Sequence, residues 1–246
     1  RGTQLILSRA HKNFVDSLFK SEVPEINEGI VKIMGISRDP GGRTKIAVSS
    51  ADSDIDAVGA CVGMRGSRVQ NIIQELKGEK IDIVPWSPDP ARFSCNALSP
   101  ARVNKVILDE SSKIMEVIVD EDQYSLCIGR RGQNVRLASE LTQWEITVKT
   151  DIQLKEEQQS VVKLLLTLPN ISEVNANLLF AGGYHTLEDI AFGEIDSISK
   201  SSGITNEEDI NKIQLAARNA LKDRLRNIEV DDNEDDFEED SEEKLS

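Results

Sequence analysis

Two short segments of this chain carry glycines at a spacing that suits phosphate binding. The first reads CVGMRGSRVQNI from Cys61, and the second reads CIGRRGQNVRLA from Cys127, sixty-six residues later. In each segment two glycines flank two residues, at least one of them arginine, and a helical pattern follows. Glycine allows a sharp turn and a close approach of the backbone to a ligand. The helix that begins after the second glycine offers unpaired N–H groups and a partial positive charge, which together attract a phosphate.

The spacing therefore predicts two phosphate-binding loops, residues 63–66 and residues 129–132. Their members are Gly63, Met64, Arg65, Gly66, Gly129, Arg130, Arg131 and Gly132. We expect Arg68 and Arg136, in the following helices, to add attraction at longer range. Because Met64 stands where the second loop has an arginine, the second loop should attract phosphate more strongly. A single Gly-x-x-Gly is equally compatible with a tight corner between two helices, but two copies in one context favour the binding interpretation.

The two loops belong to a longer internal repeat. Aligning Cys61 with Cys127 also pairs Val58 with Tyr124, Val69 with Val135, and, after a one-residue shortening, Ile81 with Ile146. Apolar periodicity predicts the order α-β-β-α-α-β in both copies. The first copy has a helix ending before Pro24, strands at 29–39 and 44–50, helices at 56–61 and 67–76, and a strand at 80–84. The second has a helix at 90–98, strands at 103–109 and 114–120, helices at 121–127 and 133–142, and a strand at 145–149.

The connector between the copies is the segment PWSPDP, residues 85–90. Three prolines in six residues make it stiff, because proline fixes its own φ and restricts the residue before it. A connector this short and rigid predicts that the two copies pack against each other.

The order α-β-β-α-α-β, with Gly-x-x-Gly between the paired helices, resembles the KH domain in its bacterial, type II topology. The resemblance implies an α+β fold with tandem type II KH domains over residues 8–84 and 91–150. KH loops hold about four nucleotides of single-stranded nucleic acid each. It also implies an apolar groove floor at Val62 and Ile128, beside the loop residues and arginines named above.

The segments GACVGMRGSRVQNIIQELKGEKIDIV, PWSPDPARF, NALSPA and IGRRGQNVRLASELTQWEITV closely resemble the tandem KH region of the NusA family of bacterial transcription elongation and antitermination factors. In that family a polymerase-binding domain and an OB-fold precede the KH pair, and residues 1–7 resemble the end of such an OB-fold. The resemblance implies binding of nascent single-stranded RNA, association with RNA polymerase and other elongation or antitermination factors, and effects on pausing, termination and antitermination. We expect a cytoplasmic monomer.

The last third of the chain differs in charge. Residues 1–150 carry 20 basic and 20 acidic residues, whereas residues 151–246 carry 9 and 23 and account for the net charge of −14. After a linker at 151–160, residues 161–228 predict an all-α helix-hairpin-helix domain that turns at Gly182 and Gly183. Its expected core is Leu178, Leu179, Leu187, Ile190 and Ile198. Residues 229–246, with one basic and 11 acidic residues, predict a disordered acidic tail.

Helix-hairpin-helix units in many proteins hold nucleic-acid phosphates, but eight basic against 12 acidic residues over 151–228 argue against that role here. The pattern resembles an acidic repeat that follows the KH pair in some members of the NusA family, where it docks on polymerase or masks the RNA site. We therefore expect residues 151–246 to form a protein-interaction module, with autoinhibition as one version of that hypothesis. A helical bundle that has no partner is the alternative.

Several classes of function have no support in the sequence. The three cysteines form no CxxC pair, and His11 and His185 lie far apart, so we expect no metal and no cofactor. No window approaches the roughly 18 apolar residues of a membrane span. We find no nucleophile–base pair, so we expect no enzyme. Two alternatives are the RNA-binding appendage of an exoribonuclease and a DNA-binding helix-hairpin-helix protein.

Overall fold

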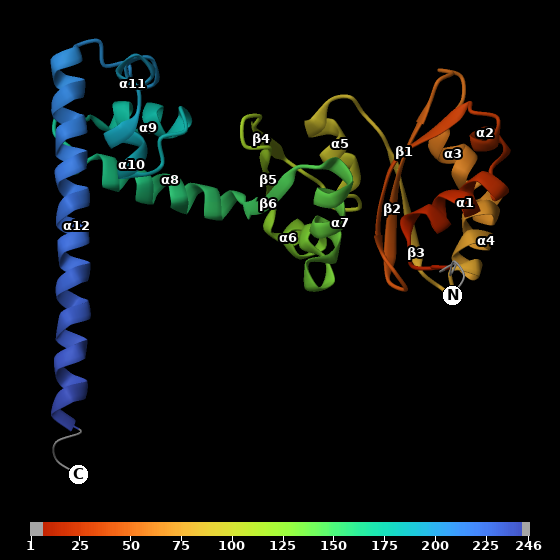
Figure 1. The fold of residues 1–246 in the computed structure, drawn as a ribbon. Coiled ribbons are helices and arrows are strands. Elements are labelled where there is room, and N and C mark those ends of the chain that lie inside the picture. Colours follow the sequence, from red (N-terminus) through yellow and green to blue (C-terminus); the bar gives the residue numbers. More distant parts are fainter. Residues whose placement is uncertain (1–6, 243–246) are drawn as a thin grey trace, which may run out of the picture. The chain divides into compact units, whose positions relative to one another are not determined.

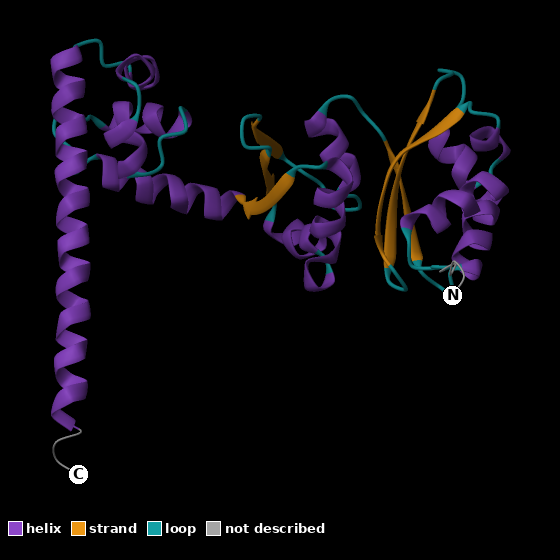
Figure 2. Cartoon of the chain, in the orientation of Figure 1, coloured by secondary structure: helices purple, strands orange, loops and turns teal. Residues whose placement is uncertain are grey.

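The computed structural model describes the backbone of residues 7–242 and the side chains of residues 7–224 and Arg226. The chain divides into two compact units, Arg1–Ile152 and Gln153–Ser246, and each is described by itself below. Helices and strands are distinguished in Figure 2. The first unit mixes helices with two three-stranded sheets, whereas helices are the only regular elements among the described residues of the second unit, which confirms the predicted α+β class.

The first repeat folds in the predicted order. Its elements are α1 (Lys12–Glu22), α2 (Pro24–Asn27), β1 (Val31–Asp39), β2 (Arg43–Ser50), α3 (Ala57–Val62), a short 3-10 turn η1 (Met64–Gly66), α4 (Ser67–Glu75) and β3 (Lys80–Pro85). β2 is the central strand, antiparallel to β1 and parallel to β3. Helices α1, α3 and α4 cover one face of this sheet (Figure 1), where Phe19, Ile46 and Ile72 form part of a buried core.

The second repeat has the same topology. It contains α5 (Pro90–Ala97), β4 (Lys105–Asp109), β5 (Ile114–Val119), α6 (Glu121–Ile128), the 3-10 turn η2 (Arg130–Gly132), α7 (Gln133–Thr142) and β6 (Glu145–Thr150). β5 is again central, antiparallel to β4 and parallel to β6. Helix α5 begins at a proline after Asp89, whose carboxylate accepts a hydrogen bond from the Ala91 N–H at 3.1 Å. A proline at the first helical position and an aspartate cap are favourable signals for a helix start.

The two repeats pack against each other, which confirms the prediction drawn from the short connector. Helices α5 and α7 of the second repeat cover the face of the first sheet that its own helices leave open (Figure 1). Ala47 and Val84 of that sheet lie in one continuous apolar core with Leu98 and Leu141. The sheet of the first repeat thus packs against helices on both faces, so the positions of the two loops depend on the same packed interface.

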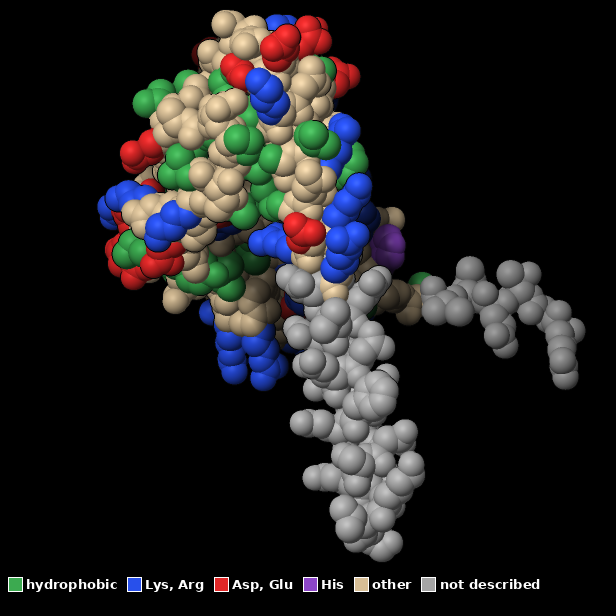
Figure 3. Space-filling model, turned by 90° about the vertical axis from the view of Figure 1, so that its left-hand side faces the viewer, with side chains coloured by type: hydrophobic (Ala, Val, Ile, Leu, Met, Phe, Trp, Pro, Cys, Tyr) green, Lys and Arg blue, Asp and Glu red, His purple; other side chains and the backbone are tan. Residues whose placement is uncertain are grey.

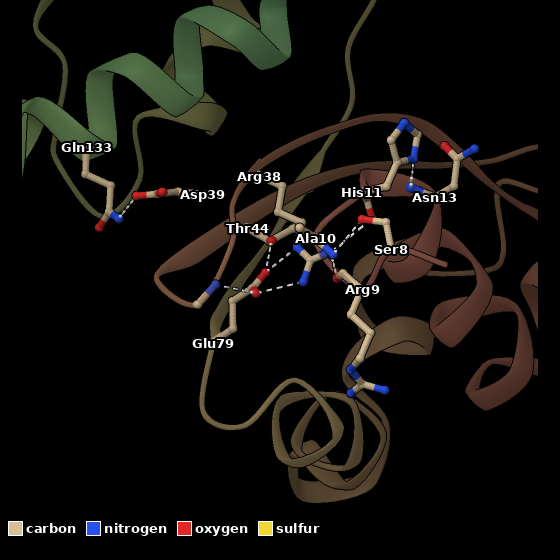
Figure 4. A network of polar contacts seen from close by, with 11 residues as sticks. Ser8, Arg9, Ala10, His11, Asn13, Arg38, Asp39, Thr44, Glu79 and Gln133 are labelled. Carbon is tan, nitrogen blue, oxygen red and sulfur yellow. Dashed lines mark hydrogen bonds and ion pairs between the residues drawn. The ribbon is translucent and has the colours of Figure 1, made fainter. Parts of the chain in front are cut away.

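A buried ion pair fixes the turn between β1 and β2 (Figure 4). Arg38 donates to both oxygens of Glu79 at 2.9 Å, and these side chains are 5% and 1% exposed. Thr44 Oγ1 and the Gly41 N–H also donate to Glu79. Burial raises the pKa of Glu79, but these hydrogen bonds outweigh burial and leave the pKa below its ordinary value. Separating the buried Glu79 carboxylate from these hydrogen-bond partners would cost free energy, so they hold the turn at residues 39–42 in place.

Arg38, one partner of this ion pair, also binds residues near the start of the described part of the chain. Arg38 Nη1 donates to the backbone oxygens of Arg9 and His11 at 2.7 and 2.9 Å. The prediction that residues 1–7 continue an OB-fold falls largely on residues 1–6, which lie outside the described residues.

The second unit is built from five helices among its described residues. They are α8 (Asp151–Leu165, whose first residues belong to the first unit), α9 (Glu173–Ala181), α10 (Leu187–Phe192), α11 (Ile195–Ser202) and α12 (Glu207–Glu242). Capping boxes at Ser172 and Thr186 start α9 and α10. Four of the five predicted core residues are buried, but Leu178 is 45% exposed, because its neighbour Leu179 takes the inward position on α9.

Two segments outside the predicted helical domain are helical in the structure. Residues 151–160, predicted as a linker, form the first turns of α8. Helix α12 runs as far as Glu242 and so includes most of the segment 229–246, whose predicted disorder stays a prediction, and residues 243–246 lie outside the described residues. In both segments neither glycine nor proline interrupts the chain, and glutamate and lysine are good helix formers.

Candidate nucleic-acid interface

The two Gly-x-x-Gly loops have nearly the same backbone. The leading glycines, Gly63 and Gly129, both have φ of 74°, with ψ of 176° and 173°. The arginines at the third position have left-handed φ values of 52° and 55°. The closing glycines are left-handed as well, with φ of 82° and 72°. Because the same conformation occurs twice, the loop is a property of the repeat and not of one local sequence.

The two glycines of each loop serve different purposes. A Cβ on Gly63 would lie 2.6 Å from Arg68 Cγ, and a Cβ on Gly129 would lie 2.7 Å from Asn134 Cβ. A Cβ on Gly66 or Gly132 would meet nothing within 4 Å. The leading glycine is therefore required by packing inside the loop, whereas the closing glycine leaves open space that a ligand's backbone can approach.

In each loop, the side chain nearest the leading glycine also holds the loop in place through hydrogen bonds. Arg68 donates to the Ala60 carbonyl at 2.6 Å and to Glu25 at 2.8 Å. At the equivalent position of the second repeat, buried Asn134 donates to the carbonyls of Cys127 and Leu98, both at 3.0 Å. The structure thus gives the predicted RNA-binding residue Arg68 a role in holding its own loop. Its role in RNA binding stays a prediction.

The surface of each loop offers donors and cations to a ligand. Arg65, Arg130 and Arg131 are exposed, and Met64 is 88% exposed. The residues expected to floor the groove, Val62 and Ile128, are half-buried. No side chain caps the first turns of α4 and α7. An uncapped helix start presents N–H groups and positive potential, which is the arrangement that binds phosphate.

The second loop is bordered by a residue of the first repeat. Asp39, at the end of β1, accepts a hydrogen bond from Gln133 Nε2 at 2.7 Å and from Arg136 Nη2 at 3.2 Å. Gln133 directly follows Gly132, so this contact lies beside the loop (Figure 4). The predicted phosphate contact Arg136 is therefore paired with a carboxylate. The role of Asp39 could not be recognised in the sequence, because an aspartate before Pro-Gly-Gly is also what an ordinary turn requires.

The contacts also indicate which elements of the first unit lie beside each loop. Arg68, beside the first loop, contacts Glu25 in α2, whereas the second loop lies beside Asp39, where β1 ends. The exposed residues of both loops place the loops at the surface.

Comparison with known families identifies this arrangement. Residues 9–86 match the NusA-like first KH domain, and residues 90–156 match the NusA-like second KH domain. Residues 9–156 are a NusA-like pair of KH domains. The pairing of both matches, in this order and without overlap, agrees with the internal repeat and with the two sheets of the first unit.

Two curated relatives extend the similarity beyond the KH pair. The transcription termination/antitermination protein NusA of Rickettsia prowazekii (strain Madrid E) is 44% identical over 214 residues, which cover 84% of this chain and 42% of the relative. The protein of the same name from Rickettsia conorii (strain ATCC VR-613 / Malish 7) is 45% identical over the same shares. This NusA-like chain therefore spans about two fifths of the length of the relatives that it matches.

No helix among the described residues is long and apolar enough to cross a membrane. In the same part of the chain, no group of three or more His, Cys, Asp or Glu side chains is placed to hold a metal ion.

Proposed function

We propose that the KH pair binds one single-stranded RNA through both Gly-x-x-Gly loops. The observation that carries this proposal is the open space at the closing glycines, Gly66 and Gly132, next to uncapped helix starts and exposed arginines. With about four nucleotides per loop, a strand of roughly eight or more nucleotides would engage both repeats. The packed interface between the repeats supports a single track, because the loops are carried by one unit.

We further propose that RNA binding serves the regulation of transcription by a longer protein. The support comes from the names of the Rickettsia relatives and from the NusA-like order of the two KH domains. The protein would associate with RNA polymerase, capture the nascent transcript, and so influence pausing, termination and antitermination. The mechanism is positional: binding energy holds the transcript away from or close to hairpin formation, and no covalent step is needed.

The second unit is proposed as a protein-interaction module. Its acidic balance disfavours a phosphate ligand. Val174, Phe192 and Leu215 are 68%, 75% and 59% exposed, and apolar side chains are seen at the surface among charged ones in Figure 3. Where such side chains form a contiguous patch they mark a site for another protein, and these three residues are the candidates for that patch.

The test of RNA binding is the double variant Gly66→Asp/Gly132→Asp. Both positions are left-handed and open, and aspartate tolerates that conformation better than most residues, so the fold should persist. Each carboxylate would stand where a phosphate is expected. We expect the affinity for a 12-nucleotide unstructured RNA to fall at least about 30-fold, or roughly 2 kcal/mol, in fluorescence anisotropy at fixed salt.

The matched control is Gly78→Asp/Gly183→Asp. These glycines also have positive φ and nothing within 4 Å of a built Cβ, but they lie outside the loops. The control carries the same added charge and the same backbone strain, so it should bind RNA within about threefold of wild type. Wild-type affinity in the folded Gly66→Asp/Gly132→Asp protein would refute the proposed function.

A further inference from the structure

The second loop has a carboxylate beside it that the first repeat contributes. Asp39 Oδ2 accepts from Gln133 and Arg136, the first and fourth residues after the closing glycine of that loop. Figure 4 shows Asp39 and Gln133 pointing toward each other across the interface. The surface next to the second loop is therefore built by both repeats, and this contact is additional to the family's loop residues.

The position of this carboxylate is fixed from two sides. Within the first repeat, the buried Arg38–Glu79 pair holds the turn that Asp39 begins. Across the interface the approach is close, since a Cβ on Gly42 of the same turn would lie 2.9 Å from Gln133 Nε2. The backbone that carries Asp39 is therefore held in place beside the second loop.

The carboxylate is also accessible. The side chain of Asp39 is 38% exposed and that of Arg136 is 55% exposed. Both contacts of Asp39 go to Oδ2, and within the described part of the chain no side chain donates a hydrogen bond to Oδ1. A preoriented acceptor thus faces solvent beside the loop.

The chemistry of a carboxylate limits what it can recognise. It accepts hydrogen bonds and repels phosphate, so it must meet an N–H or O–H donor of the strand. Cytosine presents an N4 amino group, a known partner of Asp and Glu, whereas a uracil presents the O4 acceptor in its place. We propose that Asp39 accepts a hydrogen bond from the exocyclic amino group of a base held at the second loop and disfavours uracil there. This inference rests on the proposed RNA binding.

The repeat supplies a matched control. Asp109 ends β4 as Asp39 ends β1, but its carboxylate accepts from Ser111 and Ser112 of its own turn. An Asp109→Asn variant therefore removes the same charge from the same position of the fold, away from the contact with Gln133.

The experiment compares oligo(C) and oligo(U) of eight nucleotides by fluorescence anisotropy at fixed salt. Wild type should bind oligo(C) roughly tenfold more tightly, as one charge-assisted base contact predicts. In Asp39→Asn the amide oxygen can still accept from Gln133 and Arg136, while its NH₂ group tolerates uracil O4. The ratio of the two affinities should therefore fall to about one, and Asp109→Asn should keep the wild-type ratio.

Each other outcome overturns the inference in a distinct way. Equal wild-type affinities for the two oligonucleotides, or a ratio that Asp39→Asn leaves unchanged, would show that Asp39 does not read the base. If Asp39→Asn weakens both oligonucleotides equally, the carboxylate meets a 2′-hydroxyl or serves only the interface, and base reading is excluded. If wild type binds neither, the proposed RNA binding itself fails.

Discussion

Alanine substitutions at the two glycines of the second loop should separate folding from binding. Gly129 has φ of 74° and ψ of 173°, whereas Gly132 has φ of 72° and ψ of 12°. A Cβ on Gly129 would lie 2.7 Å from Asn134 Cβ and 2.9 Å from the Asn134 backbone nitrogen. A Cβ on Gly132 would contact nothing within 4 Å.

The expected losses of unfolding free energy have a backbone contribution and a packing contribution. At Gly132 the cost is that of a left-handed alanine, about 1 kcal/mol of unfolding free energy. The conformation of Gly129 is almost restricted to glycine and costs about 1–3 kcal/mol for alanine. Overpacking against backbone adds about 1–3 kcal/mol more. Moving Asn134 would also strain its bonds to Cys127 and Leu98. We therefore expect Gly129→Ala to be the more destabilising variant by about 3 kcal/mol.

Urea unfolding followed by tryptophan fluorescence measures this difference directly. The chain has two tryptophans, Trp86 and Trp144, and both belong to the first unit. Their signal therefore reports on that unit and not on the helical one. RNA affinity should show the reverse order, since the methyl group of Gly132→Ala occupies space that a phosphate would approach. Equal unfolding midpoints for Gly129→Ala and Gly132→Ala would refute the assignment of separate roles.

Two further measurements test the electrostatics of binding and the role of the second unit. Each phosphate contact on a single strand contributes about 0.7 to the slope of log affinity against log salt. Replacing both Arg130 and Arg131 with Gln should therefore reduce this slope by about 1.4, whereas Arg65→Gln should reduce it by about 0.7. Equal reductions would contradict the prediction that the second loop attracts phosphate more strongly. Removing residues 157–246, which lie beyond both KH matches, should raise RNA affinity at fixed salt if the second unit masks the RNA site. Unchanged affinity would exclude autoinhibition and leave protein interaction as the proposed role of the second unit.

The order of elements and the packing of the repeats followed from the sequence for physical reasons. Apolar side chains recur at strand and helix periods, and the repeat doubles every signal, so the topology could be predicted even where one copy was weak. The stiff connector predicted the interface because its prolines leave little freedom. In the second unit the hairpin helices could be predicted in the same way, but the exposure of Leu178 could not. A helix rich in apolar residues does not reveal which of two adjacent leucines faces inward.

The partners of individual polar side chains could not be predicted in this way. Arginines near a Gly-x-x-Gly loop look alike in sequence, yet Arg68 binds Glu25 and a carbonyl, and Arg136 binds Asp39 across the interface. These pairs depend on the register of elements that lie far apart in the chain. One signal was present, because the repeat alignment places Asn134 opposite Arg68. Because one of these two residues is charged and the other is neutral, what they share is a structural role in the repeat and not a charge for binding phosphate.

These pairings change how the KH pair should bind. With Arg68 and Arg136 engaged in contacts within the protein, the exposed cations of the loops are Arg65, Arg130 and Arg131. Three phosphate contacts would give a salt slope of only about 2 on a single strand. Much of the affinity must then come from contacts that depend on shape and base identity. The Asp39 carboxylate at the second loop would increase this dependence on base identity. It lowers the affinity for phosphate in general and favours strands that offer it a hydrogen-bond donor.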